Sequence, residues 1–362
     1  MSAERSNEAD GPRVIPKGWF IYRGTGVPRD ERKDVPLRKA LPPPPPWRDF
    51  TGGPVLSPPA EDLAELDRRL GPVDFLPPRR ADPKEVAAVN AALCLRRPLL
   101  VTGNPGVGKS TLAYQISREL HLGPVLRWPV NSRTTLRSGL YEYDAIGRVQ
   151  DARTRAGNEE PEQGTDIGEY LRLGPLGTAL LPYRLPRVLL IDEFDKSDAD
   201  LANDLLDVLE EGSYQVPELF RIRSRTPEVA VHISDPEQSA VITKGAVCCR
   251  AFPFIVITSN GEREFPPAFL RRCVQLHMVE PGQERLAELV TARFSSAAEP
   301  YKDRLIQEFL AYRRRHPVAA DQLLNALYLA IHGQGGQDPM DDQTWKQVLD
   351  VVLQRLDAAG AG

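Results

Sequence analysis

The feature that most constrains this chain is a glycine-rich loop sequence at residues 103–110, GNPGVGKS. It follows the apolar run PLLVT and precedes STLAYQISREL, whose apolar residues recur at helical spacing. In that context the loop turns its backbone N–H groups around a chain of phosphates, and the N-terminus of the helix adds partial positive charge. The spacing GxxxxGK[ST] brings Lys109 to the β- and γ-phosphate oxygens and the Ser110 hydroxyl to Mg²⁺. The alternative is a tight strand-to-helix turn with no ligand.

Five short apolar runs, separated by helical or polar stretches, predict the core of the fold. Strands that are buried on both faces of a parallel sheet have continuous rather than alternating apolar residues. The sequence therefore predicts an α/β domain with a parallel sheet. The runs are residues 98–102, 124–130, 187–193, 252–260 and 273–279.

The 362 residues are expected to form two or three domains, at roughly 100–200 residues per domain. Residues 1–80 hold fifteen of the 34 prolines, including the run Pro42–Pro46, which fixes φ and removes amide donors. We expect this segment to be extended and to serve as a linker or as a strap over the next domain. The alternative is a docking ligand for an aromatic groove on a partner. The aromatic stretch 18–26 is expected to pack on the body of the protein.

The rest of the chain divides into a nucleotide-binding α/β domain and a helical lid. The α/β domain is expected over residues 81–280 and begins with a helix capped by Asp82, with Pro83 at its first position. Its polar interval 144–175 is expected to be an exposed insertion. Residues 281–362 contain four stretches with apolar residues three and four apart, which predict a bundle of four amphipathic helices.

Two carboxylates end the apolar run VLLIDE at residues 188–193. At the carboxyl edge of a central strand, Asp192 would hold magnesium through water, and Glu193 would orient and deprotonate the attacking water. A solvated acidic turn without such a role is the alternative. Asp195 and Lys196, in the same turn, are expected to be surface charges.

Polar residues also end the next apolar run. Asn260 can hydrogen-bond both a γ-phosphate and an attacking water at the edge where ligands bind in open α/β sheets. Alternatively, it initiates the turn Asn260–Gly261. Arg272 lies twelve residues after Asn260 and follows Arg271. This pair is either a solvated face or the source of an arginine that acts in phosphoryl transfer. An arginine donated across a subunit boundary accelerates phosphoryl transfer by ~10³-fold or more.

Together, GNPGVGKST, VLLIDE, TSN and PPAFLRR, followed by helical sequence, resemble the AAA+ ATPases, and within them the MoxR-like branch. The resemblance covers roughly residues 82–350. It implies a P-loop NTPase fold, with Asp192 and Glu193 as Walker B, Asn260 as sensor 1 and Arg272 as the arginine finger, or Arg271 in its place. It assigns Ser110 and Asp192 to the metal. The residues assigned to Walker A are Gly103, Asn104, Pro105, Gly106, Val107, Gly108, Lys109, Ser110 and Thr111.

This resemblance implies a protein that binds ATP and Mg²⁺, hydrolyses ATP, and forms a ring, expected to be a hexamer, that remodels a protein client. A finger at the edge after the fourth strand does not easily reach its own γ-phosphate, so each site would need a neighbouring copy. The stretches 18–26, 42–50 and 139–148 also resemble a bacterial subgroup. That subgroup is found beside von Willebrand-type and protease or effector proteins in multi-component conflict systems.

Composition limits the other possibilities. The formal net charge of −4 makes nucleic acid an unlikely partner, and no apolar stretch predicts a membrane span or an export signal, so we expect a cytoplasmic protein. Four cysteines without CxxC spacing predict neither a disulfide framework nor a zinc site, and the five histidines lack metal-ligand spacing. Three alternative functions remain: a nucleotide-dependent assembly switch or scaffold with little hydrolysis, a P-loop kinase, and a nucleic-acid translocase.

MoxR-like proteins usually carry a sensor 2 arginine at the start of a lid helix, but the corresponding stretch 316–330 contains no arginine. Arg313, Arg314 and Arg315 lie just before it, so either one of them reaches the nucleotide or sensor 2 is absent. We predict that sensor 2 is absent and that Arg315→Ala therefore retains ATP turnover, measured as steady-state phosphate release. Loss of turnover in a folded Arg315→Ala protein would contradict this.

Overall fold

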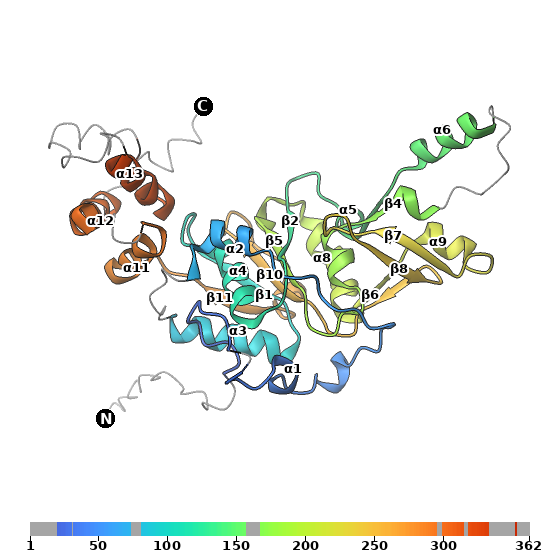
Figure 1. Cartoon of the computed structure of the whole chain (residues 1–362), viewed down its shortest axis with the longest axis horizontal. Helices are drawn as coiled ribbons and strands as arrows, with labels where there is room; N and C mark the ends of the chain where they lie inside the picture. The colour runs from blue at the N-terminus through green and yellow to red at the C-terminus, as the bar shows by residue number, and fades with distance from the viewer. Residues whose placement is uncertain are drawn as a thin grey trace, which may run out of the picture.

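The computed structural model describes residues 20–30, 32–73, 81–156, 167–294, 299–314, 318–332 and 352. Figure 1 shows a central α/β core, with C-terminal helices at one end of the molecule and a second sheet at the other. Within the described residues, every helix is too short or too polar to cross a membrane.

The core is a five-stranded parallel sheet in the order β11-β1-β10-β5-β2. This confirms the predicted α/β fold with a parallel sheet, and each of its strands lies in one of the five apolar runs. Because all the strands run in the same direction, their carboxyl ends meet at one edge. The strands are β1 (Leu99–Thr102), β2 (Leu126–Pro129), β5 (Val188–Asp192), β10 (Phe254–Ser259) and β11 (Val274–His277).

Helices with apolar faces cover this sheet. The expected first helix, α3 (Pro83–Leu95), begins where the Asp82 side chain accepts a hydrogen bond from the Lys84 N–H, 2.8 Å away. The glycine-rich loop leads into α4 (Lys109–Leu120), which packs against β5 and β10. On α8 the buried residues recur three and four apart, as a helix lying on a core requires. The further helices of the core are α5 (Leu136–Leu140), α7 (Pro175–Ala179), α8 (Ala199–Glu211), α9 (Pro217–Ile222) and α10 (Pro267–Leu270).

A second, mostly antiparallel sheet lies beside the core, in the order β3-β4-β7-β8-β9-β6. In this sheet β7, β8 and β9 pair as consecutive antiparallel strands. The prediction of an exposed insertion over 144–175 is wrong at its C-terminal end, because Leu171 and Leu173 of β4 are buried in the core. The strands are β3 (Tyr141–Tyr143), β4 (Leu171–Leu173), β6 (Ser213–Gln215), β7 (Glu228–His232), β8 (Ser239–Thr243) and β9 (Ala246–Cys248).

The N-terminal part of the insertion does extend from the body, as α6 (Ala145–Ala156) at the upper right of Figure 1. Residues 157–166, the polar centre of the insertion, lie outside the described residues. The chain returns to the second sheet through a 3-10 turn, η4 (Ile167–Tyr170), whose Ile167 is buried.

The C-terminal helices, which the sequence predicts to be a lid, form their own apolar core. They are α11 (Gln283–Phe294), α12 (Glu299–Arg313) and α13 (Ala320–His332), and Leu286, Phe309 and Leu327 are among the buried residues that join them. The fourth expected helix lies outside the described residues except for Val352, which packs against this core.

The N-terminal segment, described over 20–73 apart from residue 31, runs across the core and is called the strap below (Figure 1). It contains α1 (Leu37–Ala40), the 3-10 turn η2 (Pro46–Arg48) and α2 (Leu63–Leu70). The expectation of a segment extended throughout is therefore wrong at α2, where the Asp62 side chain accepts a hydrogen bond from the Glu65 N–H. Pro45, with φ −55° and ψ 145°, has the polyproline II geometry expected of the proline run.

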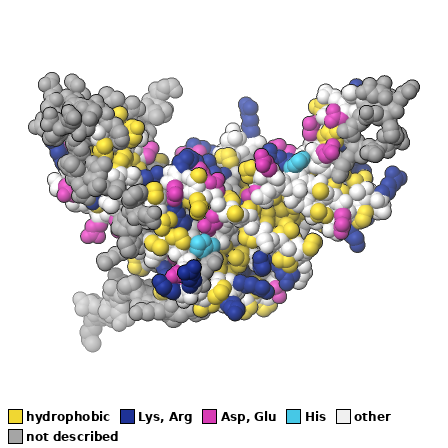
Figure 2. Space-filling view, in the orientation of Figure 1, with side chains coloured by type: hydrophobic (Ala, Val, Ile, Leu, Met, Phe, Trp, Pro, Cys, Tyr) yellow, Lys and Arg dark blue, Asp and Glu magenta, His cyan; other side chains and the backbone are white. Residues whose placement is uncertain are grey.

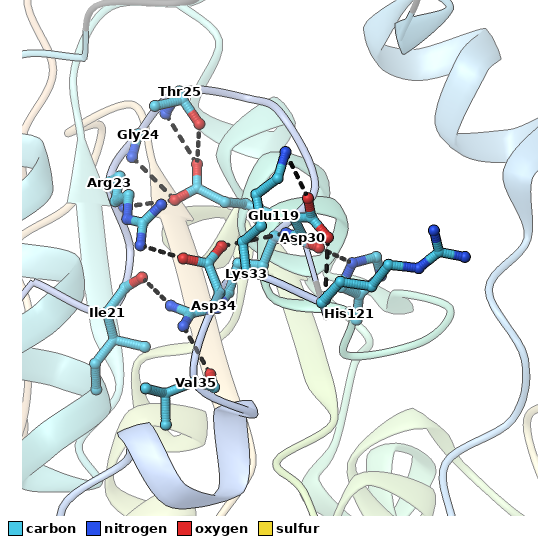
Figure 3. Close-up of polar contacts among 12 residues, drawn as sticks. Ile21, Arg23, Gly24, Thr25, Asp30, Lys33, Asp34, Val35, Glu119 and His121 are labelled. Carbon is cyan, nitrogen blue, oxygen red and sulfur yellow. Dashed lines mark hydrogen bonds and ion pairs between the residues drawn. The ribbon is translucent and has the colours of Figure 1, made fainter.

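One buried carboxylate ties the strap to the end of α4 (Figure 3). Glu119 accepts hydrogen bonds from four consecutive backbone N–H groups, those of Arg23, Gly24, Thr25 and Gly26. The positive φ of Gly24 and Gly26, 69° and 71°, lets the chain turn these donors toward one side chain. Glu119 is 1% exposed, so these bonds replace its lost hydration.

A second anchor holds the aromatic stretch. The Asn90 side chain on α3 accepts hydrogen bonds from the N–H groups of Ile21 and Tyr22 and donates one to the Tyr22 carbonyl oxygen. Both Ile21 and Tyr22 are buried, which confirms the packing expected of this stretch. Trp19, which belongs to the same stretch, lies outside the described residues.

We predict that Glu119→Ala lowers the free energy of unfolding by about 3 kcal/mol, because it leaves several buried N–H donors without an acceptor. Glu119→Gln keeps one acceptor oxygen and should lie between Ala and wild type. Urea denaturation measures the free energy, and the rate of tryptic cleavage within the strap reports its release. Wild-type stability and cleavage in the Ala variant would show that this contact is not an anchor.

Candidate nucleotide-binding site

The glycine-rich loop joins β1 to α4 at the carboxyl edge of the sheet. Gly108 has a φ of 95°, and a Cβ added to it would meet no atom within 4 Å, so space is open at the N-terminus of α4. No side chain caps this helix, which leaves its first N–H groups available to an anion. At Gly106, by contrast, a Cβ would lie 2.3 Å from the Cβ of Ala319, so the lid contacts the loop.

Lys109 lies inside this loop and is 8% exposed. Its Nζ donates to the carbonyl oxygens of Gly103 and Asn104, at 2.7 and 2.9 Å, and to Oδ1 of Asn260, at 2.7 Å. Burial lowers the pKa of Lys109, while the negative charges of Asp195, Asp192 and Glu193 oppose that shift. The structure thus brings the lysine and the asparagine together.

Asp192, at the end of β5, contacts side chains from three other segments of the chain. Its Oδ1 accepts hydrogen bonds from Oγ of Ser110, at 2.6 Å, and from Oγ1 of Thr258, at 2.8 Å. Its Oδ2 lies 3.7 Å from a guanidinium nitrogen of Arg127 on β2. Mg²⁺ prefers oxygen ligands, and the Ser110 hydroxyl and the Asp192 carboxylate supply them, so these two residues fit a magnesium ion.

The sequence predicted no role for Thr258 or Arg127. Thr258 is 1% exposed, and besides donating to Asp192 it accepts the Glu193 N–H at 2.9 Å, so it fixes the turn at the end of β5. The one sequence signal that could have indicated Thr258 is its hydroxyl group within an otherwise apolar run. The Arg127 contact carries no sequence signal, because it depends on β2 pairing with β5.

Glu193 adopts a left-handed backbone conformation, with φ 59° and ψ 48°, directly after β5. Such a conformation is uncommon for residues other than glycine and concentrates at functional sites. The Glu193 carboxylate is half-exposed and pairs with Nζ of Lys196 at 2.9 Å, which raises the lysine pKa. It lies on the solvent side of the site, where a water molecule can reach it.

The expectation that Asp195 is a surface charge is wrong. Asp195 is 3% exposed, and its Oδ2 accepts the backbone N–H groups of Asn260, at 2.8 Å, and Glu262, at 3.1 Å. It therefore fixes the turn that follows β10 and, with it, the position of Asn260. Lys196 is exposed, as expected.

The turn after β10 tests the alternative in which Asn260 only initiates the turn Asn260–Gly261. The Gly261 N–H bonds to Oγ of Ser259, at 3.0 Å, while the Asn260 side chain bonds to Lys109. The Ser259 hydroxyl thus accepts the hydrogen bond of the turn, and the side-chain amide of Asn260 contacts the glycine-rich loop.

The segment between β11 and α11 approaches the loop through Glu280, for which the sequence predicted no role. Its carboxylate accepts a hydrogen bond from Nδ2 of Asn104, at 3.0 Å, and pairs with Nε of Arg313 on α12, at 3.3 Å. Of the three arginines before α13, Arg313 is therefore linked to the loop through a carboxylate. Arg315 lies outside the described residues.

The arginine pair follows α10, away from these contacts. Arg272 donates from Nε to Glu210, at 2.6 Å, and from Nη1 to the Ala268 carbonyl oxygen, at 3.1 Å. Arg271 is exposed, and among the described residues its guanidinium forms no ion pair. Within the described part of the chain, neither arginine hydrogen-bonds to the glycine-rich loop.

Residues 98–273 match the family described as the AAA domain (dynein-related subfamily). This part of the chain is similar to an AAA domain. The match begins at β1 and ends just after Arg272, so it contains every residue predicted for the site. The match supports a nucleotide-binding ATPase of the AAA+ class, in agreement with the sequence motifs. A comparison with curated proteins finds no match to the chain.

We predict that Asp195→Ala displaces Asn260, because two backbone N–H groups of the turn lose their charged acceptor. The expected cost is about 2–3 kcal/mol of stability and about a tenfold loss of ATP turnover. Thermal unfolding and phosphate release measure the two effects. Asp204→Ala, which removes an exposed carboxylate from the middle of α8, is the control and should change neither. Equal behaviour of the two variants would contradict the role assigned to Asp195.

Proposed function

We propose that this protein is an ATP-hydrolysing AAA+ protein of the MoxR-like branch, whose sites are completed by a neighbouring copy of the chain. One observation carries the proposal. Hydrogen bonds of 2.6–2.8 Å join Lys109 to Asn260, and Ser110 and Thr258 to Asp192, at a single edge of the sheet. These are the residue types that hold a triphosphate, a magnesium ion and a water in this fold.

In this function, Lys109 and the loop N–H groups bind the β- and γ-phosphates, and Asn260 exchanges its bond to Lys109 for one to the attacking water. Glu193 accepts a proton from that water as its oxygen bonds to the γ-phosphorus and the bond to the ADP oxygen breaks. Mg²⁺, held by Ser110 and Asp192, would neutralise developing charge on the phosphates. Thr258 and Asp195 keep Asp192 and Asn260 in position.

The positive charge that completes the nucleotide-binding site comes from Arg272 of a neighbouring copy, with Arg271 as the alternative. Support comes from the position of the pair after α10, where neither guanidinium is bonded to the loop of its own chain within the described residues. The family resemblance supports a hexameric ring and a protein client, in a bacterial system with a von Willebrand-type or protease partner. On the face shown in Figure 2, acidic and basic side chains are interspersed over the described residues, which argues against nucleic acid as the client.

A second function, a nucleotide-dependent assembly switch with little hydrolysis, is favoured by one observation. The carboxylate of Glu193 pairs with Lys196 at 2.9 Å, and a carboxylate engaged in that ion pair is not free to orient the attacking water. Turnover per site distinguishes the two functions, because a switch binds ATP and assembles at wild-type levels without releasing phosphate.

We predict that Arg272→Ala binds ATP with wild-type affinity but loses turnover by ~10³-fold. Glu193→Gln should retain bound ATP without releasing phosphate. Isothermal titration calorimetry measures binding, and phosphate release measures turnover. Arg271→Ala is the matched control and should keep most activity. Wild-type turnover in Arg272→Ala would remove the finger assignment, and in Glu193→Gln it would place the base elsewhere.

A further inference from the structure

A buried arginine of the strap forms a charged cluster outside the nucleotide-binding site. The side chain of Arg48, in η2, is 2% exposed, and its Nη2 lies 3.1 Å from Oε2 of Glu210 at the end of α8. Its Nη1 also donates to the carbonyl oxygens of Leu209 and Glu210. Arg48 therefore binds both the side chain and the backbone of the last turn of α8.

The other oxygen of the same carboxylate holds the proposed finger. Oε1 of Glu210 accepts the Nε hydrogen of Arg272 at 2.6 Å, and Nη1 of Arg272 donates to the Ala268 carbonyl oxygen. These two bonds fix the plane of the guanidinium. Its Nη2 group has no hydrogen-bond partner among the described residues, so it is available to an acceptor outside the chain.

Further contacts fix the part of the strap that carries Arg48. The Arg48 guanidinium lies over the ring of Phe252, 5.2 Å from its centroid, and Phe50 stacks on that ring at 5.9 Å. The Gly52 N–H bonds to the Cys249 carbonyl oxygen at 3.1 Å. These contacts set the position of Arg48 before it meets Glu210.

Glu210 alone would not orient Arg272. Its side chain is 39% exposed and sits on the last turn of a helix, where a carboxylate is disfavoured by the helix dipole. The buried charge of Arg48 selects one orientation of the carboxylate, because the guanidinium needs a partner to offset its lost hydration. The orientation of Arg272 then follows from that of Glu210.

We propose that Arg48 is a positioning residue for Arg272 and acts through Glu210, so that the proline-rich strap takes part in ATP hydrolysis at the site of the neighbouring copy. This inference rests on the proposed function, in which Arg272 works in that neighbouring site. The strap thereby gains a role in turnover beyond its role in packing.

The test uses mixtures of two full-length chains that are each inactive. An Arg272→Ala chain keeps its own Glu193 but lacks the finger, and a Glu193→Gln chain keeps the finger but lacks the base. Mixing them restores activity only at sites where the second chain donates Arg272 to the first. Arg48→Ala is then placed either on the finger donor or on the chain that supplies the site.

With Arg48→Ala on the finger donor, phosphate release by the mixture should fall about tenfold or more. On the chain that supplies the site, which has no Arg272 to position, the same substitution should leave the activity unchanged. Glu210→Gln, which keeps the shape of the side chain, should show the same asymmetry, and Arg48→Lys should restore part of the activity. Arg23→Ala, a strap arginine paired with Asp34, is the control and should have no effect on either chain.

The mixtures distinguish failure of the proposed function from failure of the role of Arg48. If the two inactive chains fail to restore activity together, the shared site of the proposed function is wrong, and this inference falls with it. If they restore activity but Arg48→Ala and Glu210→Gln act equally on both chains, or on neither, then the contact is structural and the inference alone is overturned.

Discussion

The site depends on one carboxylate oxygen, Oδ1 of Asp192, which accepts hydrogen bonds from Ser110 and Thr258. In the parallel sheet β10 lies between β1 and β5, so the three chain segments that follow these strands are neighbours at one edge. The bond from Ser110 fixes the start of α4, and the bond from Thr258 fixes the strand that leads to Asn260. The geometry of the glycine-rich loop thus follows from sheet order as much as from its glycines.

The strap stabilises two carboxylates in a similar way, both of them away from the carboxyl edge of the parallel sheet. Glu119 and Glu210 both lie in the last turn of a helix, where a negative charge is disfavoured by the helix dipole. Donors from the strap meet both carboxylates: backbone N–H groups at Glu119 and the Arg48 guanidinium at Glu210. The strap therefore stabilises charges that α4 and α8 disfavour, and both helices lead to or from residues of the nucleotide-binding site.

Much of the core could be predicted because its signals are local. The apolar runs of the parallel strands and the capped start of α3 depend on residues close together in the sequence. The strands β3, β4 and β6 could not be predicted, since three residues are too short to show alternation. The burial of Asp195 was missed because a carboxylate in a turn looks solvated until its partners, the N–H groups after β10, are placed by the sheet. The pairing of Arg48 with Glu210 spans 162 residues and has no local signal.

The most direct test of the central claim, that a triphosphate binds at the loop around Lys109, is a calorimetric titration of the full-length chain with ATP and Mg²⁺. The account predicts saturable binding at one site per chain, and its loss in Lys109→Ala, provided that the variant keeps the thermal unfolding midpoint of the wild type. Binding of equal affinity in the two proteins would contradict the account, because the nucleotide would then lie elsewhere.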